Sequence, residues 1–318
     1  MATGIQRVAI FGVRGSTSPS VSVTINSHKA SGNFGTPITA ALQRAGFDLT
    51  IITRTESKAT FPSGIRVIRA TYTVEELSKA LTGQDAVICV VGPAGIKSQI
   101  AMIDGAEAAG VKRFIIDDFG WGPGIHGLPE FEGIQSQRRR AWEHAKARSE
   151  ANPKFTYSGI ATGNPIDWAL KLFPRMGFDI KQCSAIIYDA GTERFTGTTL
   201  EGIGQAVVGV LQHPEETQNR VVKALSIITC QNELLEAFQK ATAKEWDITR
   251  SSTKALLESG RSKLKAGDRG WILDLIIAQL FGEGSSRCVV VPSREESDAE
   301  LLGIVEESPH SVVAKVLR

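Results

Sequence analysis

Over roughly the first 120 residues, short apolar runs alternate with segments in which apolar side chains recur at helical spacing. Apolar runs bounded by turn residues are typical of buried strands, and apolar residues three or four apart are typical of one helix face. The predicted strands are 8–11, 48–53, 65–69, 85–91, 111–116 and 154–161, and the predicted helices are 36–46, 74–81, 98–109 and 135–151. This alternation predicts a doubly wound parallel sheet of the α/β class.

Beyond Trp168 the alternation loosens, which predicts a smaller α+β portion. We expect 185–188 and 195–196 to form a short strand pair, followed by a helix at 200–211, a strand at 220–228, a helix at 232–243 and a short strand at 246–249. The helix predicted for Trp271–Phe281 is apolar on nearly every side. It is too short to span a bilayer, so it is either a buried wall of a substrate pocket or a dimer contact.

The turn after the first strand resembles a nucleotide-binding turn with an interruption. The first strand ends on Gly12, and the following helix is predicted from Thr36, with Pro37 near its start. If residues 13–29 are left out, the turn reads Gly-Ala-Ser-Gly-Asn-Phe-Gly, which has the spacing GxxGxxG. Glycines let backbone N–H groups approach a pyrophosphate, and the helix N-terminus favours its negative charge. The predicted cofactor residues of this turn are Gly12, Ser31, Gly32, Asn33, Phe34 and Gly35.

The interrupting segment, Val13 to Lys29, has seventeen residues rich in Ser, Thr and Val, and no helical or strand period. One hypothesis is an unspliced short intron, because Val13-Arg14 and Lys29 can be encoded with a splice donor and acceptor. The other hypothesis is a genuine surface insertion, since doubling the length of a loop costs only about 0.6 kcal/mol. A mass-spectrometric read of the native protein across Gly12 to Ala30 decides between them.

Other strand ends carry the remaining cofactor candidates. In folds of this type an acidic residue at the end of the second strand binds the ribose 2′-hydroxyl of NAD, and an arginine there accommodates the 2′-phosphate of NADP. Arg54 occupies this position, which favours NADP (NADPH) over NAD. Gly92 and Pro93 follow the fourth strand, Phe119 follows the fifth and Thr162 follows the sixth. We expect the nicotinamide near these residues.

Composition narrows the class of protein. The chain has 318 residues, of which 42% are hydrophobic, enough for a sizeable core. A net charge of +2 gives no indication of nucleic-acid or membrane binding, and no apolar run reaches the length of a spanning helix. Met1 to Arg7 holds no apolar core of a secretory signal, so we expect a cytoplasmic protein. The four scattered cysteines predict reduced structural thiols.

The sequence offers few groups for catalysis. The Gly- and Pro-rich stretch 121–133 follows a strand end, which predicts a substrate-side loop containing His126 as a potential proton donor. Asp117 and Asp118 are adjacent carboxylates, and such residues commonly cap turns or hold loops. The Arg-rich helix 135–151 also carries glutamates and is typical of a solvated face. No segment has metal-ligand spacing.

The chain resembles the NmrA-like and isoflavone-reductase-like family of atypical short-chain dehydrogenase/reductases. The resemblance rests on 8–12 with 30–35, 51–54, 83–88, 109–115, 118–120, 195–196 and 232–235, and covers nearly the whole chain. It implies an NAD(P)-binding Rossmann domain, here 1–165 with the insertion at 13–29, and a substrate-binding portion, 166–318, interleaved with it. Reductases of this family carry a lysine on the helix after the Asp-Phe-Gly loop. Its position falls near Gln135, and an amide does not donate a proton as an ammonium does.

Two functions follow from this resemblance. The first is an NADP-dependent oxidoreductase that transfers hydride to a small, aromatic substrate, with its catalytic proton donor unidentified. The second is a non-catalytic, dinucleotide-sensing regulator that binds a protein partner. The missing lysine favours the regulator, whereas the loop 121–133 and the apolar helix 271–281 indicate a substrate pocket and favour the enzyme.

Overall fold

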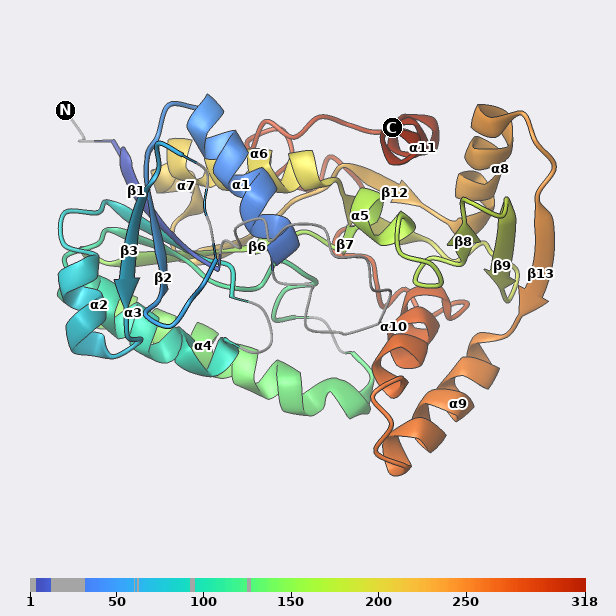
Figure 1. Cartoon of the computed structure of the whole chain (residues 1–318), viewed down its shortest axis with the longest axis horizontal. Helices are drawn as coiled ribbons and strands as arrows, with labels where there is room; N and C mark the ends of the chain where they lie inside the picture. The colour runs from blue at the N-terminus through green and yellow to red at the C-terminus, as the bar shows by residue number, and fades with distance from the viewer. Residues whose placement is uncertain (1–3, 13–31, 60, 62, 92–94, 125–126) are drawn as a thin grey trace.

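The computed structural model describes residues 4–12, 32–59, 61, 63–91, 95–124 and 127–318. Figure 1 shows a sheet flanked by helices in the half of the molecule that holds the N-terminus, and a smaller part formed mainly by later segments of the chain.

A seven-stranded parallel sheet forms the larger part. Its strands are β1 (Arg7–Phe11), β2 (Asp48–Arg54), β3 (Arg66–Ala70), β4 (Ala86–Cys89), β5 (Arg113–Ile115), β6 (Thr156–Ala161) and β11 (Arg220–Lys223). They lie in the order β11-β6-β5-β4-β1-β2-β3. Every residue of β4 and β5 is buried, as both-face burial in a parallel sheet requires. The doubly wound parallel sheet predicted from the alternation is confirmed.

Helices cover both faces of this sheet (Figure 1). One face carries α1 (Gly32–Arg44) and α6 (Leu200–Gln212), and the other carries α2 (Val74–Ala80), α3 (Gln99–Ala108) and α4 (Glu132–Ala151). Short helices η2 (Ile96–Ser98), η3 (Pro129–Phe131) and α7 (Pro214–Thr217) lie in the connections. Side chains alternate between the faces along β1: Val8 and Ile10 pack with α1 and α6, whereas Ala9 and Phe11 pack with α2 and α3.

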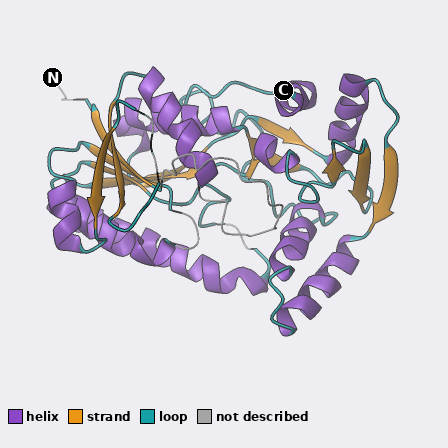
Figure 2. Cartoon of the chain, viewed as in Figure 1, coloured by secondary structure: helices purple, strands orange, loops and turns teal. Residues whose placement is uncertain are grey.

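The smaller part contains two three-stranded sheets and five helices (Figure 2). One sheet is β12 (Ile227–Thr229), β10 (Phe195–Thr198) and β7 (Asn164–Pro165); the other is β13 (Asp247–Ser251), β9 (Ser184–Tyr188) and β8 (Phe178–Asp179). The helices are α5 (Ile166–Leu170), α8 (Gln231–Thr242), α9 (Thr253–Lys265), α10 (Trp271–Phe281) and α11 (Pro309–Leu317). Phe178, Phe238 and Trp246 pack together in its core, with ring centroids 5.1–6.2 Å apart.

The predicted strand pairing in this smaller part is wrong. Segments 185–188 and 195–196 do not pair with each other, because β9 pairs with β13 and β8, while β10 pairs with β12 and β7. The single strand predicted for 220–228 is two strands in different sheets. Between them the Ala224 N–H donates to the carbonyl of Ala161, and the Ser226 N–H donates to Gly197, so the backbone changes hydrogen-bonding partner there.

The helix predictions also need correction. Helix α1 begins at Gly32 and not at Thr36, so Pro37 lies inside it, where proline removes one intrahelical hydrogen bond. Helices α5, α7, α9 and α11 are absent from the prediction. For α11 the sequence does hold a signal, because Ser308 and Ser311 form a capping box ahead of a proline-started helix.

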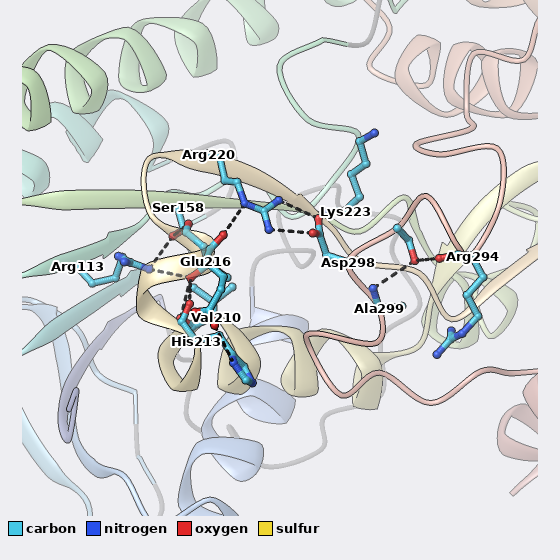
Figure 3. A network of polar contacts seen from close by, with 12 residues as sticks. Arg113, Ser158, Val210, His213, Glu216, Arg220, Lys223, Arg294, Asp298 and Ala299 are labelled. Carbon is cyan, nitrogen blue, oxygen red and sulfur yellow. Dashed lines mark hydrogen bonds and ion pairs between the residues drawn. The ribbon is translucent and has the colours of Figure 1, made fainter. Parts of the chain in front are cut away.

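A polar network joins the strands of one half of the sheet (Figure 3). Arg113 of β5 is only 3% exposed, and its guanidinium donates to Thr156 at 2.8 Å, to Ser158 and Thr217 at 3.0 Å and to the Pro214 carbonyl at 2.6 Å. These acceptors are all neutral. Burial lowers the pKa of Arg113 to about 10. The network therefore ties β5 and β6 to α7 through one buried cation.

The same view shows how the segment around Asp298 is attached to the sheet (Figure 3). Both carboxylate oxygens of Asp298 accept from the Arg220 guanidinium, at 2.9 and 3.2 Å, and one also accepts from the Lys223 N–H at 2.7 Å. A two-point arginine contact fixes orientation as well as distance. Asp298 thereby holds this segment against β11.

Within the described ranges, no helix combines the length and apolar character needed to cross a membrane. All four cysteines are free thiols, and Cys89, Cys230 and Cys288 are buried.

Candidate functional site

Strands β1 and β4 are parallel neighbours in the sheet, and the order of the strands switches direction between them. Strand β1 is followed by α1 on one face, and β4 is followed by α3 on the other. Ligands of open α/β sheets bind at such a switch point, where the two connections diverge and leave a crevice. The topology therefore places the candidate site here.

Gly12 ends β1 at this point, in a conformation that glycine alone adopts easily. Its φ is +84°, and a Cβ atom built on it would lie 1.7 Å from the carbonyl oxygen of Val90. The Val90 N–H also donates to the Phe11 carbonyl at 3.2 Å. The backbones at the two strand ends thus approach each other so closely that only glycine fits at position 12.

The predicted residues Gly32, Asn33, Phe34 and Gly35 lie in the first turn of α1 and not in a loop before it. The first turn contains no acidic residue, so the helix dipole favours an anion there. The other predictions nearby, Ser31, Gly92, Pro93 and the segment 13–29, lie outside the described residues, as does His126.

An aromatic group covers the site from the side of α1. The Phe34 ring lies 6.4 Å from Phe119 and 6.3 Å from Trp168, measured between centroids. Two of the predicted residues, Phe34 and Phe119, are therefore brought together. Sequence reasoning missed Trp168, although it lies just after the turn that follows β6. Thr162 is fully buried, its N–H donates to the Gly120 carbonyl, and its own carbonyl accepts from Thr198.

Arg54 lies at the end of β2 with 66% of its side chain exposed. Its ion pair is with Glu56, at 3.4 Å, and surface pairs of this kind contribute about 0–1 kcal/mol. Tyr72 lies close by, its ring edge-on to Phe11. Burial and the neighbouring Cys89 raise the pKa of Tyr72 to about 12, and the charge of Arg54 opposes that rise. Arg54 thus presents an accessible cation beside an aromatic ring at this edge.

The two aspartates after β5 have different surroundings. Both are buried, and the Asp117 N–H donates to the Gln99 side chain at 2.7 Å. Asp118 accepts from the Trp142 indole N–H at 3.2 Å and lies 3.6 Å from the Arg138 guanidinium. Burial raises the pKa of Asp118, while Arg138 and the indole N–H oppose that rise. Asp118 is therefore part of an ion pair between the β5 loop and α4.

A pocket of about 50 Å³ opens beside this pair. We call it the Asp118 pocket; its lining includes Asp118, Trp121, Gly122, Gln135, Arg138 and Trp142. Gln135 therefore faces the same space as Asp118. A larger cavity of about 490 Å³ lies at the opposite edge, around the start of β5. The topology favours the smaller one, because it adjoins the carboxyl ends of the strands.

The loop 121–133 and α10, both predicted to belong to a substrate pocket, contact each other. Trp271 at the start of α10 packs on Phe131, with centroids 5.4 Å apart, and the Leu128 N–H donates to Gln279 at 2.9 Å. Among the described residues, no group of three or more His, Cys, Asp or Glu side chains could hold a metal ion.

Comparisons with known proteins agree with this geometry. Residues 30–149 match the model of an NAD(P)H-binding family, a match that starts directly after the segment 13–29. Oxidoreductase poxI of Penicillium oxalicum is 65% identical over 290 residues, which are 91% of this chain and 92% of that protein.

Two solved structures show a similar fold. AtPrR2 with NADP⁺ and (+)-pinoresinol has a TM-score of 0.75 at 17% identity, covering all of this chain and 99% of that one. Isoflavone reductase has a TM-score of 0.71 at 16% identity, covering 96% and 98%. The chain therefore belongs to the same family of oxidoreductases as poxI, and it carries an NAD(P)H-binding domain on the parallel sheet.

Proposed function

We propose that this protein is an NADPH-dependent reductase of a small aromatic substrate. The observation that carries the proposal is the close approach of Gly12 to Val90 at the switch point, next to the N-terminus of α1. That arrangement fits a dinucleotide pyrophosphate, and the relative poxI is named an oxidoreductase. The substrate class is suggested by isoflavone reductase and by the pinoresinol complex, both of similar fold.

The described residues fit the cofactor at two points. Gly12 and the first turn of α1 would hold the pyrophosphate, and Arg54 would hold the 2′-phosphate of NADPH. When bound, the cofactor supplies hydride. Phe34, Phe119 and Trp168 form an apolar wall that would exclude water and orient a flat substrate. In this proposal residues 1–165 bind the cofactor and 166–318 supply most of the substrate side.

Cofactor choice provides the test. We expect Arg54→Ala to weaken NADPH binding about 10- to 100-fold, because it removes hydrogen bonds to a charged group, and to leave NADH binding within about twofold. Fluorescence titration of the purified protein with each nucleotide measures both constants. Arg66→Ala is the matched control, since Arg66 is an exposed arginine at the opposite end of the adjacent strand. Equal losses for NADPH and NADH would contradict the assignment of Arg54.

A second function is favoured by one specific observation, the presence of Gln135 where the reductases carry lysine. In this alternative the protein senses the dinucleotide and binds a protein partner without turnover. NADPH oxidation against a panel of aromatic carbonyl and enone substrates separates the two functions. Turnover supports the reductase, and tight NADPH binding without turnover supports the sensor.

The segment 13–29 bears on either function because it follows Gly12 directly. Titration of the full chain and of a variant lacking Val13–Lys29 with NADPH measures its effect. Equal affinity supports an insertion that folds away from the site, and binding by the deletion variant alone supports the unspliced intron.

A further inference from the structure

Arg138 is a cation of α4 that lines the Asp118 pocket. It lies three residues after Gln135, so both side chains lie on one face of α4, and both line the Asp118 pocket. Arginine stays protonated at any physiological pH and does not act as a proton donor. Its contribution to a reaction must therefore be charge and hydrogen bonds.

The guanidinium of Arg138 has hydrogen-bond donors that are not fully used. Its Nη1 atom lies 3.6 Å from Asp118, longer than the 2.7–2.9 Å usual for a charge-assisted hydrogen bond. Its Nε atom is buried and has no hydrogen-bond partner within the described part of the chain. A guanidinium carries five N–H donors, and a buried donor without a partner costs free energy. The side chain is thus held beside Asp118 but incompletely satisfied.

The pocket has the size of a functional group and not of a ring. A cavity of about 150 Å³ is needed to take up benzene, three times the 50 Å³ found here, whereas one water occupies about 30 Å³. Trp121 and Trp142 supply flat apolar walls. Such a space accepts the oxygen-bearing end of an aromatic compound, with the ring outside.

The β5 loop connects the pocket with the aromatic residues at the start of α1. A Cβ built on Gly120 of this loop would be 3.5 Å from Asp118 and 3.7 Å from Arg138. Its carbonyl accepts the N–H groups of Thr162 and Gly163 at the end of β6. Phe119, directly before it, contacts Phe34 of α1.

We propose that the Asp118 pocket is the subsite for a neutral carbonyl oxygen of the substrate, which Arg138 binds by hydrogen bonding. This inference rests on the proposed reductase function and specifies the substrate class for that site. Asp118 balances the charge of Arg138, and Arg139, the other cation that lines the pocket, is paired with Glu132. The pocket therefore favours an uncharged acceptor over a free carboxylate. Hydride addition to the carbonyl carbon moves the C=O π electron pair onto the oxygen, which then takes a proton from water. The Arg138 charge stabilises the oxyanion before that proton arrives.

Charge selectivity tests the subsite without any turnover. Acetophenone and benzoate are matched probes, because they share a ring and differ in carrying a neutral carbonyl or a carboxylate. Ligand-observed NMR titration of the full chain gives both dissociation constants. We expect the wild type to bind acetophenone more tightly than benzoate. Arg138→Met should weaken acetophenone binding about tenfold or more, and Arg138→Lys should weaken it less.

Asp118→Asn leaves the Arg138 charge unbalanced and should shift the acetophenone-to-benzoate preference at least tenfold toward benzoate. Gln135→Lys adds a positive charge to the same pocket without removing a buried carboxylate, so it should shift the preference in the same direction even if Asp118→Asn does not fold. Arg140→Met removes an exposed charge from the same helix and should change neither constant by more than about twofold. The proposal is overturned if the ratio of the acetophenone and benzoate dissociation constants stays the same in both Asp118→Asn and Gln135→Lys. It is also overturned if Arg138→Met binds acetophenone as tightly as the wild type.

NADPH titration of the same preparations separates this proposal from the one on which it rests. Selective probe binding by a chain that binds no NADPH supports the subsite and contradicts the reductase. If the chain binds NADPH but does not bind acetophenone at millimolar concentration, the proposed carbonyl subsite is overturned and the proposed reductase function is not.

Discussion

Replacing Gly12 with alanine tests the close contact between the ends of β1 and β4. The new methyl group would lie 1.7 Å from the Val90 carbonyl oxygen, and the backbone would have to keep a φ of +84° or move. Either response alters the turn that we propose binds the pyrophosphate.

The loss of stability expected for Gly12→Ala has two parts. A non-glycine residue in the left-handed region costs about 1–2 kcal/mol. Forcing an extra methyl into a packed contact costs a further 1–3 kcal/mol or so, because strand ends have to separate. Gly12→Ala should therefore lower the free energy of unfolding by about 2–5 kcal/mol. Gly46→Ala is the matched control: its φ is +81°, but nothing lies within 4 Å of a built Cβ, so only the first part applies.

Urea denaturation followed by circular dichroism measures both variants, and NADPH titration of the folded proteins follows. We expect Gly12→Ala to lose more stability than Gly46→Ala and to bind NADPH more weakly. Equal losses of stability in the two variants would refute the steric reasoning, since they would leave only the backbone conformation as a cause.

Two further predictions concern stability. Desolvation raises the pKa of Asp85, but hydrogen bonds from the Arg7 N–H and side chain, the Gln6 N–H and Lys112 outweigh it and lower the pKa to about 2, from an unfolded value of 3.8. A carboxyl group with a lowered pKa stabilises the folded state at pH values above its unfolded pKa. The free energy of unfolding should therefore fall by roughly 2 kcal/mol as the pH falls from about 4 to 2. Urea titrations at several pH values should show that Asp85→Asn lacks this part of the pH dependence. Asp298→Ala should lower the free energy of unfolding by about 1–3 kcal/mol in thermal unfolding, because it removes the acceptor of Arg220 and of the Lys223 N–H. Asp298→Asn keeps an acceptor oxygen and is the control. An equal or smaller loss of stability in Asp298→Ala than in Asp298→Asn would contradict this prediction.

Local sequence patterns predicted the larger part of the fold well. The apolar runs predict six of the seven strands of the central sheet. The seventh, β11, was predicted as part of a longer strand, 220–228, in the smaller portion of the chain. Helix α10 has the predicted bounds, Trp271–Phe281. These segments are long or strongly apolar. A strand buried on both faces of a parallel sheet is a nearly continuous run of apolar residues, which can be recognised from the sequence.

Some candidate site residues can be recognised from local spacing, and others depend on a partner far away in the sequence. The glycine at the end of β1 and the arginine at the end of β2 are found from spacing alone, because the carboxyl ends of parallel strands lie at one edge. The roles of Trp168, Arg138 and Trp142 were missed. Each depends on a partner in another element, Phe34 for Trp168 and Asp118 for the other two, and no local period records such a pair.

By itself the sequence determined the alternation of strands and helices and the positions of Gly12 and Arg54 at the ends of two neighbouring strands, because these depend on backbone periodicity and on residues within one βα unit. Only the tertiary structure decided which short strands pair after residue 164, and it alone joined the β5 loop to α4 through Asp118 and Arg138. Pairing between short strands depends on long-range packing, and a charge pair depends on how two elements are oriented. The Asp118 pocket lies where the β5 loop meets α4, so it depends on the second condition.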